Sequence, residues 1–376
     1  MEIYVHIPFC VKKCTYCDFL SAPADDDTKD KYVLALCDEI KNGSLKEEPV
    51  SSIFIGGGTP SILKGEQIEK IMKTIYENYS VNSDAEISIE CNPGTVTYEK
   101  LLDYKRCGIN RISFGLQSAH NNDLKELGRI HTFEEFAENY KLAREVGFDN
   151  INVDLMSGLI NQSFEKFVDT LNQVANLNPE HISVYSLIIE EGTPLYDYVQ
   201  KMDDNGIDVR PSEDVDREIY RATKQILAGF GYDRYEISNY AKAGFECKHN
   251  VGYWTGASYI GFGIGAASYI NYGDKAIRYK NTESLKEYLD DFTVKKDMDS
   301  LNVDDMMSEY MILGFRMCKG ISKRYFFEKF NVSLEDKYGK VIDKYLSDGF
   351  LIEKEDRVFL SEKGIDVSNY ILCDFM

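Results

Sequence analysis

The stretch Tyr4-Val5-His6-Ile7-Pro8-Phe9-Cys10-Val11-Lys12-Lys13-Cys14-Thr15-Tyr16-Cys17 places three cysteines, spaced C-x3-C-x2-C, on one loop that follows an apolar run. Three thiolates can hold three corners of a cubane iron-sulfur cluster, whereas a structural zinc ion or a fully ligated cluster takes four protein ligands. The fourth iron is then free to bind a small molecule. We therefore expect Cys10, Cys14 and Cys17 to ligate a [4Fe-4S] cluster that serves as a reaction site.

The alternative is a set of ordinary reduced thiols, or a zinc site completed by His6 or by a distant cysteine. Zinc sites usually repeat a close cysteine pair later in the chain, and this sequence contains no second pair. The other cysteines stand singly, so we predict that they are core residues or incidental thiols. These cysteines are Cys37, Cys91, Cys107, Cys247, Cys318 and Cys373.

The composition bounds the class of protein. The 376 residues are 43% hydrophobic, which is enough for a large core and more than one domain. The net charge of -20 repels nucleic acid, so we expect no nucleic-acid partner. The sequence shows no basic-then-apolar leader and no apolar run near the ~20 residues that span a bilayer. We therefore expect a cytoplasmic protein, in a reducing compartment that suits an oxygen-sensitive cluster.

Strand-like and helix-like stretches alternate over the first half of the chain, which predicts repeated βα units around a parallel sheet. We therefore expect the α/β class, with an incomplete (β/α)6 barrel. The predicted strands are Ile3-Ile7, Ser52-Ile55, Glu86-Glu90, Arg111-Gly115, Ile151-Leu155 and His181-Leu187. The clearest predicted helices are Thr28-Lys41, Glu66-Tyr79, Tyr98-Cys107, Phe133-Val146 and Phe164-Leu177, with Gly108 and Gly147 in C-cap positions.

Polar and glycine-rich residues follow these strands. The cysteine loop follows the first strand, Gly56-Pro60 the second and Glu90-Pro93 the third, while Gln117-Ser118 follows the fourth and Asp154 ends the fifth. The carboxyl ends of parallel barrel strands form the face on which active sites are built. The sequence therefore predicts one binding mouth at this face.

The remaining chain divides into two further parts. We expect domain boundaries at 1-200 for the barrel, 201-297 for an extension, and 298-376 for a C-terminal domain. In the extension, Lys201-Asp208 is predicted to be a loop and Ser212-Leu227 a helix. The last part is predicted to contain three helices followed by a hairpin, which is the order of a winged-helix-like α+β domain. The predicted helices are Val303-Met317, Ser322-Phe330 and Leu334-Leu346, and the hairpin strands are Phe350-Ile352 and Val358-Leu360. It has no concentrated Lys/Arg face, so we expect packing or partner docking rather than DNA binding.

An open cluster iron can bind the amino and carboxylate groups of S-adenosylmethionine (SAM), and reduction then gives a 5'-deoxyadenosyl radical. Gly56, Gly57 and Gly58 would let the methionine part approach the backbone, although they also suit a tight turn. Glu90 and Asp154 can accept hydrogen bonds from ribose hydroxyls, and Gln117 and Arg129 can hold the ribose or the carboxylate. The run Gly261-Gly265 lacks the strand-to-helix context of a dinucleotide fingerprint and is set aside.

His249 has unusual neighbours for a lone histidine, because Tyr253 and the single Trp254 follow it. Aromatic rings beside an imidazole suit a planar tetrapyrrole whose iron takes an axial histidine. The simpler interpretation is a structural histidine, which is how we interpret His6 and His181.

These motifs together resemble the radical SAM enzymes of the oxygen-independent coproporphyrinogen III oxidase group, and most closely the HemW-type haem chaperones. The resemblance covers nearly the whole chain. It implies that Cys10, Cys14 and Cys17 are cluster ligands and that His249 is a haem-associated histidine. It also implies SAM contacts by Tyr4, Tyr16, Gly57, Gly58, Thr59, Glu90, Gln117, Arg129 and Asp154.

Two departures favour the chaperone branch of this resemblance. The decarboxylating oxidases carry a further cysteine after the third ligand, where this chain has Asp18-Phe19, and they have a longer N-terminal extension. Two other positions depart from the family pattern: Ala267 replaces the usual histidine of a Gly-Ala-His-Ser block, and Gly158-Gln162 replaces a Gly-Leu-Pro-Gly-Gln turn.

The resemblance implies a protein that binds the cluster, SAM and haem and transfers haem to acceptor haemoproteins. Its implied partners are haem or a related tetrapyrrole, an electron donor such as flavodoxin or ferredoxin, and acceptors that include membrane-bound ones. The alternatives are oxidation of coproporphyrinogen III and radical chemistry on another tetrapyrrole.

Overall fold

The structure is a computed structural model that describes residues 1–376. Its main body is a 12-stranded mixed sheet in the order β12-β11-β10-β9-β1-β2-β3-β4-β5-β6-β8-β7. The six predicted strands pair in parallel in chain order, so the incomplete βα barrel is confirmed. They are β1 (Glu2–Ile7), β2 (Val50–Gly57), β3 (Val81–Cys91), β4 (Arg111–Gln117), β5 (Ile151–Ser157) and β6 (His181–Ser186).

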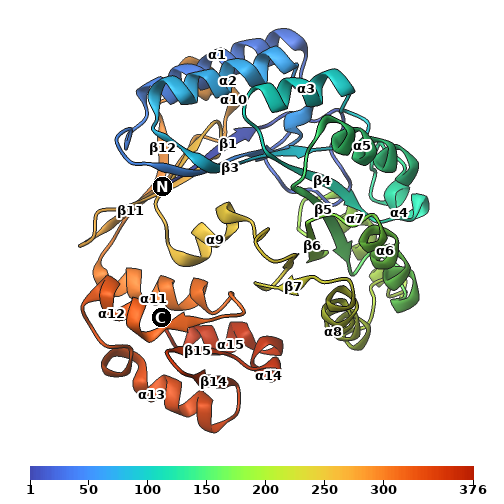
Figure 1. Cartoon of the computed structure of the whole chain (residues 1–376). Helices are drawn as coiled ribbons and strands as arrows, with labels where there is room; N and C mark the ends of the chain where they lie inside the picture. Colours follow the sequence, from blue (N-terminus) through green and yellow to red (C-terminus); the bar gives the residue numbers. More distant parts are fainter.

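Helices cover the convex face of this curved sheet, as Figure 1 shows. They are α1 (Asp26–Asn42), α2 (Gly65–Asn78), α3 (Tyr98–Arg106), α4 (Asn121–Glu126), α5 (Phe133–Val146) and α6 (Phe164–Asn176), with the short 3-10 helix η1 (Pro60–Ile62) after β2. Local residues fix their ends: Thr132 caps α5 with Glu135 in a capping box, and Gly147 ends it at φ 94°. The predicted helices thus form close to their predicted bounds.

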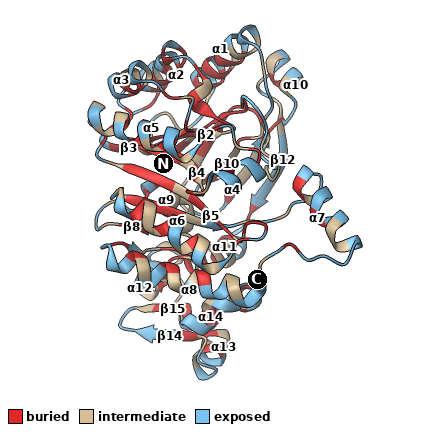
Figure 2. Ribbon diagram, turned by 90° about the vertical axis from the view of Figure 1, so that its right-hand side faces the viewer, coloured by how far each residue is buried: buried red, intermediate tan, exposed pale blue.

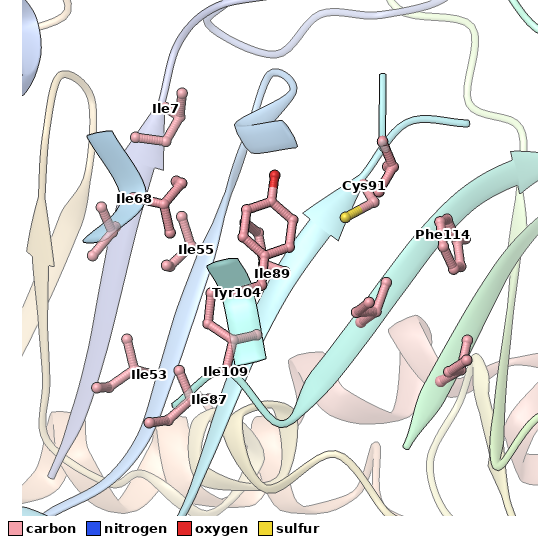
Figure 3. Packing of buried hydrophobic residues seen from close by; sticks show 14 of the residues in the cluster. Ile7, Ile53, Ile55, Ile68, Ile87, Ile89, Cys91, Tyr104, Ile109 and Phe114 are labelled. Carbon is pink, nitrogen blue, oxygen red and sulfur yellow. The ribbon is translucent and has the colours of Figure 1, made fainter. Parts of the chain in front are cut away.

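The core lies between the sheet and these helices. Alternate residues of each parallel strand point outward and are apolar, such as Ile53 and Ile55 on β2 or Ile87 and Ile89 on β3, and all four are buried. Figure 3 shows these isoleucines packing with residues such as Tyr104, and Figure 2 shows the strands buried and the outer helix faces exposed. The intervening residues, which are mostly polar, point to the concave side.

Short strands that the sequence did not reveal extend the sheet at both edges. β9 (Tyr259–Phe262) pairs in parallel with β1 and is followed by the antiparallel β10 (Ala267–Asn271), β11 (Ala276–Asn281) and β12 (Lys295–Leu301). At the other edge β8 (Asn239–Ala241) pairs with β6 and with β7 (Asp233–Arg234). The short helix α10 (Leu285–Asp290) lies between β11 and β12. β7, β8 and β9 have only two to four residues, and β12 is polar and almost entirely exposed, so these strands lack the apolar pattern by which β1 to β6 were recognised.

The predicted loop Lys201-Asp208 is wrong over its first half. The helix α7 (Pro194–Asp204) reaches Asp204, because Thr193 caps its first turn and Pro194 starts it at a position where proline is favourable. Its polar end is solvent-exposed helix, which sequence polarity alone reads as loop. The next helix, α8 (Glu213–Gly229), forms as expected.

The glycine-rich run after β9 is a tight connection to β10 rather than a phosphate loop. Gly263 has φ 97°, and a Cβ there would lie 2.4 Å from the hydroxyl of Tyr32. A Cβ on Gly261 would lie 2.3 Å from the carbonyl of Ala267. Close backbone packing therefore accounts for these glycines.

The C-terminal part has its own core of 15 buried residues and the predicted winged-helix-like order. Its elements are α11 (Val303–Gly314), β13 (Ile321–Ser322), α12 (Lys323–Phe330), α13 (Leu334–Ser347), β14 (Leu351–Lys354), β15 (Arg357–Leu360), α14 (Glu362–Asp366) and α15 (Ser368–Cys373). In Figure 1 it faces the concave side of the sheet, with α9 (Lys248–Thr255) between the two. No helix in the chain has both the length and the apolar character that crossing a membrane requires.

Candidate functional site

A cavity of about 1110 Å³ opens at the carboxyl ends of the parallel strands. Gly56 and Trp254 do not line this cavity, whereas the predicted cluster ligands, the implied SAM contacts and His249 all do. The predicted residues that line it are Tyr4, Cys10, Cys14, Tyr16, Cys17, Gly57, Gly58, Thr59, Glu90, Gln117, Arg129, Asp154 and His249. Residues up to 245 positions apart in the sequence thus meet at the predicted mouth.

The cysteine loop is held on both sides by backbone hydrogen bonds around Thr15. The Thr15 N–H donates to the carbonyl of Leu127 at 3.0 Å, and the N–H of Leu195 donates to the carbonyl of Thr15 at 2.9 Å. Cys10 is buried at the base of the loop, and its N–H donates to the carbonyl of Ala22 at 3.2 Å. The loop is therefore anchored to three other segments of the chain.

Two side chains also reach the cysteine sulfurs. Thr59 Oγ1 donates to Cys10 Sγ at 3.3 Å, and Arg129 Nη1 donates to Cys14 Sγ at 3.7 Å. Donors of this kind stabilise thiolate charge and tune iron-sulfur clusters. No three His, Cys, Asp or Glu side chains converge tightly enough to hold a single metal ion. A set of three cysteines without a fourth thiolate or imidazole fits a cubane with one open iron better than a structural zinc ion, which takes four protein ligands.

Glycine is required where β2 runs past the cysteine loop. A Cβ on Gly58 would lie 2.9 Å from the carbonyl of Phe9 and 3.0 Å from Cys10 Sγ. Gly57 has φ 114°, and a Cβ there would lie 2.6 Å from the His6 ring. This bare backbone, which we call the glycine cradle, packs against the cysteine loop and lines the cavity beside Cys10.

Two carboxyl groups line the cavity from β3 and β5, the strands on either side of β4. Glu90 Oε2 accepts a hydrogen bond from the Gly57 N–H at 3.0 Å, and Asp154 accepts from Ser113 Oγ at 2.9 Å and Asn152 Nδ2 at 2.8 Å. Burial, together with the nearby Asp154 charge, raises the pKa of Glu90 to about 8. Two such acids on one wall favour a cationic ligand.

Gln117 and Arg129 also line the cavity. Gln117 has φ 76°, a left-handed conformation that few non-glycine residues adopt, and it follows an irregularity in the pairing of β4 with β5. Arg129 Nη2 donates to Asn92 Oδ1 at 2.8 Å and to the carbonyl of Gly115, whereas its buried Nε has no partner. An unpaired buried guanidinium N–H leaves a donor for a ligand.

The helix α9 packs against the concave side of the barrel, next to the cavity. Glu86 of β3 accepts hydrogen bonds from Cys247 Sγ at 3.3 Å and from the N–H of Lys248 at 3.1 Å. A carboxylate at a helix N-terminus satisfies its free N–H groups and complements the helix dipole. This contact fixes the position of His249.

His249 is 2% exposed, and both of its ring nitrogens have partners. Nδ1 lies 2.8 Å from Ser52 Oγ and 3.6 Å from Glu2 Oε2, and Nε2 lies 3.0 Å from the hydroxyl of Tyr253. Burial, with a smaller contribution from Arg111, lowers the pKa of His249 to about 3, so its imidazole is neutral. The ring therefore presents no free nitrogen to the cavity.

His6 and His181, predicted to be structural, are also bonded at both nitrogens. His6 bonds to the Tyr4 hydroxyl and the Leu20 carbonyl, each at 3.0 Å. His181 bonds to Asn152 Oδ1 at 2.6 Å and the Tyr235 hydroxyl at 2.9 Å.

The sequence reasoning missed several lining residues. Arg111, Ser113 and Asn152 line the cavity from within the strands, and Asp366 and Asn369 line it from the C-terminal domain. The sequence could have revealed the three strand residues, because polar residues alternate with apolar ones along β4 and β5. It could not have revealed Asp366 and Asn369, because their position depends on how the C-terminal domain docks.

Ion pairs hold that domain against α8. Arg221 Nη2 lies 2.6 Å from Asp366 Oδ2, and Lys224 pairs with Glu362. The C-terminal domain thus helps to close the cavity.

A second cavity of about 540 Å³ lies between β9, β10 and the C-terminal domain. Tyr4, Phe19 and Tyr253 line both cavities and so lie between them. Ala267, the position that departs from the family pattern, lines only the second.

Two family models match this chain, one in its N-terminal half and one in its C-terminal domain. Residues 4–174 match the model of the Radical SAM superfamily, and residues 301–367 match that of the HemN C-terminal domain. The solved structure of coproporphyrinogen III oxidase (HemN) from Escherichia coli superimposes with a TM-score of 0.83 at 27% identity, over 100% of this chain and 89% of that one.

Curated relatives match over the full length. The protein named heme chaperone HemW of Bacillus subtilis (strain 168) is 36% identical, over 99% of this chain and 98% of the relative. The heme chaperone HemW of Escherichia coli (strain K12) is 35% identical, over 100% of this chain and 98% of the relative.

Proposed function

We propose, from the premise that this chain belongs to the HemW family within the radical SAM superfamily, that it binds haem and delivers it to acceptor haemoproteins. Family membership implies a [4Fe-4S] cluster and SAM. The haem and the acceptors are our proposal. The predicted family, the fold class and the radical SAM assignment are confirmed by the same comparisons.

The cavity residues fit the two implied groups. Cys10, Cys14 and Cys17 would ligate the cluster, and the glycine cradle at Gly57 and Gly58 would receive the methionine part of SAM. Glu90 and Asp154 would hold the ribose and balance the sulfonium charge, with Tyr4, Tyr16, Thr59, Gln117 and Arg129 around them. When bound, the cluster supplies the electron that cleaves SAM.

The observation that carries the haem proposal is the position of α9. This helix brings His249 and Tyr253 to the wall of the cavity that holds the cysteine loop, and it is bonded there through Glu86. The Tyr253 ring, with the imidazole of His249 behind it, offers an aromatic surface on which a planar tetrapyrrole can pack. The position of this segment therefore supports binding of a tetrapyrrole beside the radical cofactor.

Oxidation of coproporphyrinogen III is the second candidate, favoured by the superposition on HemN. In that reaction the radical abstracts a hydrogen from a propionate. Asp18 and Phe19 argue against it, because oxidases of this group carry a further cysteine there. Phe19 is instead 65% exposed at the mouth of the cavity.

Two parallel assays on one anaerobically reconstituted sample separate these functions. We expect a saturable Soret-band species at one haem per chain, with haem recovered unchanged after incubation with SAM and a reductant. We expect no protoporphyrinogen or CO2 from coproporphyrinogen III. Product formation with an intact cluster would assign the oxidase instead, and loss of haem would assign haem breakdown.

The proposal includes a cytoplasmic location, an electron donor such as flavodoxin or ferredoxin, and acceptors that include membrane-bound haemoproteins. It also divides the chain at 1-200, 201-297 and 298-376. The ion pairs of Asp366 and Glu362 with α8 support a role for the last domain in covering the cavity.

A further inference from the structure

The second cavity has the size and lining of a site for a planar, carboxylated ligand. Its volume of about 540 Å³ lies in the range of small-molecule sites. Tyr259 and Tyr269 supply a wall of stacked rings, with centroids 6.1 Å apart, and Tyr310 faces it from the C-terminal domain. Nothing in the cysteine-loop chemistry uses this cavity.

No histidine lining this cavity has a free nitrogen. The single lining histidine is His6, which is bonded to Tyr4 and to the Leu20 carbonyl. Ala267 occupies the position at which the family pattern places another imidazole. An iron ligand in this cavity must therefore come from another residue type.

Tyr253 is placed for that role. Its side chain lines both cavities, and its hydroxyl lies 3.0 Å from Nε2 of His249. It therefore stands between His249 and the second cavity. Tyrosine is a known axial ligand of haem iron, and a hydrogen bond from a second residue orients such ligands.

We propose that ferric haem occupies the second cavity, with the phenolic oxygen of Tyr253 as its iron ligand and His249 behind it as a positioning residue. This inference rests on the proposed haem-binding function. It reassigns the iron contact from His249 to the residue that covers it.

The proton balance of this contact closes with the hydroxide that ferric haem carries in water. Burial raises the pKa of the Tyr253 phenol well above its usual range, so the hydroxyl keeps its proton in the haem-free protein. Forming the iron-oxygen bond breaks the phenol O–H bond, and the displaced hydroxide takes that proton and leaves as water. Iron stays ferric and no electron is transferred.

Lys329 supplies the charge for a haem carboxylate. Its Nζ lies 3.3 Å from the carbonyls of Thr255 and Gly256, at the C-terminus of α9, which leaves its third N–H for a ligand. It has no carboxylate partner, and burial lowers its pKa. Arg278, by contrast, is already paired with Glu309 at 2.8 Å. A propionate on Lys329 would offset this desolvated charge.

Spectroscopy of three variants tests the ligand. Resonance Raman spectra of the ferric haem complex, without SAM, should show phenolate modes in the wild type and in His249→Ala, and none in Tyr253→Phe. We expect His249→Ala to weaken haem binding about tenfold, as for other residues that orient a metal ligand. Tyr4→Phe is the matched control, because Tyr4 also lines both cavities and also bonds to a histidine.

The outcomes separate the possible ligands. A ferric ligand signature lost in His249→Ala and kept in Tyr253→Phe would overturn the proposal in favour of histidine ligation. Loss in Tyr4→Phe alone would also overturn it. Far-ultraviolet circular dichroism establishes that each variant is folded.

A second measurement, of haem affinity, tests the proposed contact between Lys329 and a haem propionate. Lys329→Met should weaken haem binding about tenfold and Lys329→Arg much less, while Lys340→Met, at an exposed position of the same domain, should bind as the wild type does. The dimethyl ester of haem should bind the wild type and Lys329→Met equally. Equal haem affinity in wild type and Lys329→Met would place the haem elsewhere.

Haem binding by the wild type distinguishes failure of the proposed function from failure of the Tyr253 assignment. A wild-type protein that binds no haem would remove the proposed function and this inference together. A wild-type protein that binds haem with unchanged spectra in Tyr253→Phe would remove only the inference.

Discussion

The carboxylate of Glu86 lies beneath the first turn of α9, where its Oε2 accepts a hydrogen bond from the N–H of Lys248 at 3.1 Å. Its other oxygen accepts from Cys247 Sγ at 3.3 Å. One inward-facing residue of β3 thus fixes the helix that carries His249 and Tyr253. The position of the haem-associated residues therefore depends on a strand 160 residues earlier in the chain.

Glu86→Ala should lower the free energy of unfolding by about 1–3 kcal/mol, because it leaves the buried N–H groups of α9 without an acceptor. Urea unfolding measures this loss, and Glu86→Gln should lose less because it keeps one acceptor oxygen. Glu77→Ala, at an exposed helical position, should change stability by less than about 0.5 kcal/mol. Equal losses in Glu86→Ala and Glu77→Ala would mean that Glu86 does not anchor α9.

Cys14→Ala should abolish the visible absorption of the reconstituted cluster and the change in its EPR spectrum on adding SAM. A cubane that loses one of three ligands is not retained in its open-iron form. Cys373→Ala, at an exposed position in the C-terminal domain, should keep both signals. A cluster that survives in Cys14→Ala would show that the ligand assignment is wrong.

Glu2→Gln should make the protein more stable at alkaline pH. Burial raises the pKa of Glu2 from 4.5 to about 8. Below pH 4.5 the carboxyl is protonated in both the folded and unfolded states. As the pH rises toward 8, only the unfolded state ionises, so wild-type stability falls.

The stability gain of Glu2→Gln should therefore grow between pH 4.5 and 8, to a limit on the order of 5 kcal/mol at about 1.36 kcal/mol per pKa unit. Urea unfolding at several pH values gives this curve. Glu355→Gln, at an exposed turn position, is the control. A Glu2→Gln gain that is the same at pH 4.5 and at pH 8 would contradict the buried, protonated carboxyl.

SAM binding should release a proton from Glu90. The raised pKa of about 8 keeps Glu90 protonated at neutral pH, and a cationic ligand beside it favours the carboxylate. SAM affinity should therefore rise with pH up to about 8 and then level off. Calorimetry in two buffers of different ionisation enthalpy measures the released proton. Glu90→Gln should abolish this release and Glu99→Gln, on the surface of α3, should not; release that persists in Glu90→Gln would point to another group.

The sequence was sufficient to predict the barrel and its mouth because both depend on local signals. The β-branched strands and capped helices, such as Thr132 to Gly147, are decided by residues within one element. The functional loops follow those strands, so Cys10, Gly57 and Glu90 could be brought together from topology alone. All of them line one cavity.

The rest depends on contacts between distant segments. β9 has only four residues and β12 is polar and almost entirely exposed, so neither shows an apolar pattern. Asp366 reaches the cavity only because α14 pairs with α8. His249 was recognised from its neighbours in sequence, but only the fold shows that Tyr253 covers its Nε2. That relationship depends on how α9 sits in the barrel, which no local pattern encodes.

The transfer of haem is the central claim, and stopped-flow absorption measures it directly. Haem-loaded, anaerobically reconstituted protein is mixed with increasing concentrations of an apo respiratory haem protein, and the shift of the Soret band is followed. The account predicts a transfer rate that rises with acceptor concentration and exceeds passive haem release. A rate that is independent of acceptor concentration and equal to passive release would contradict it.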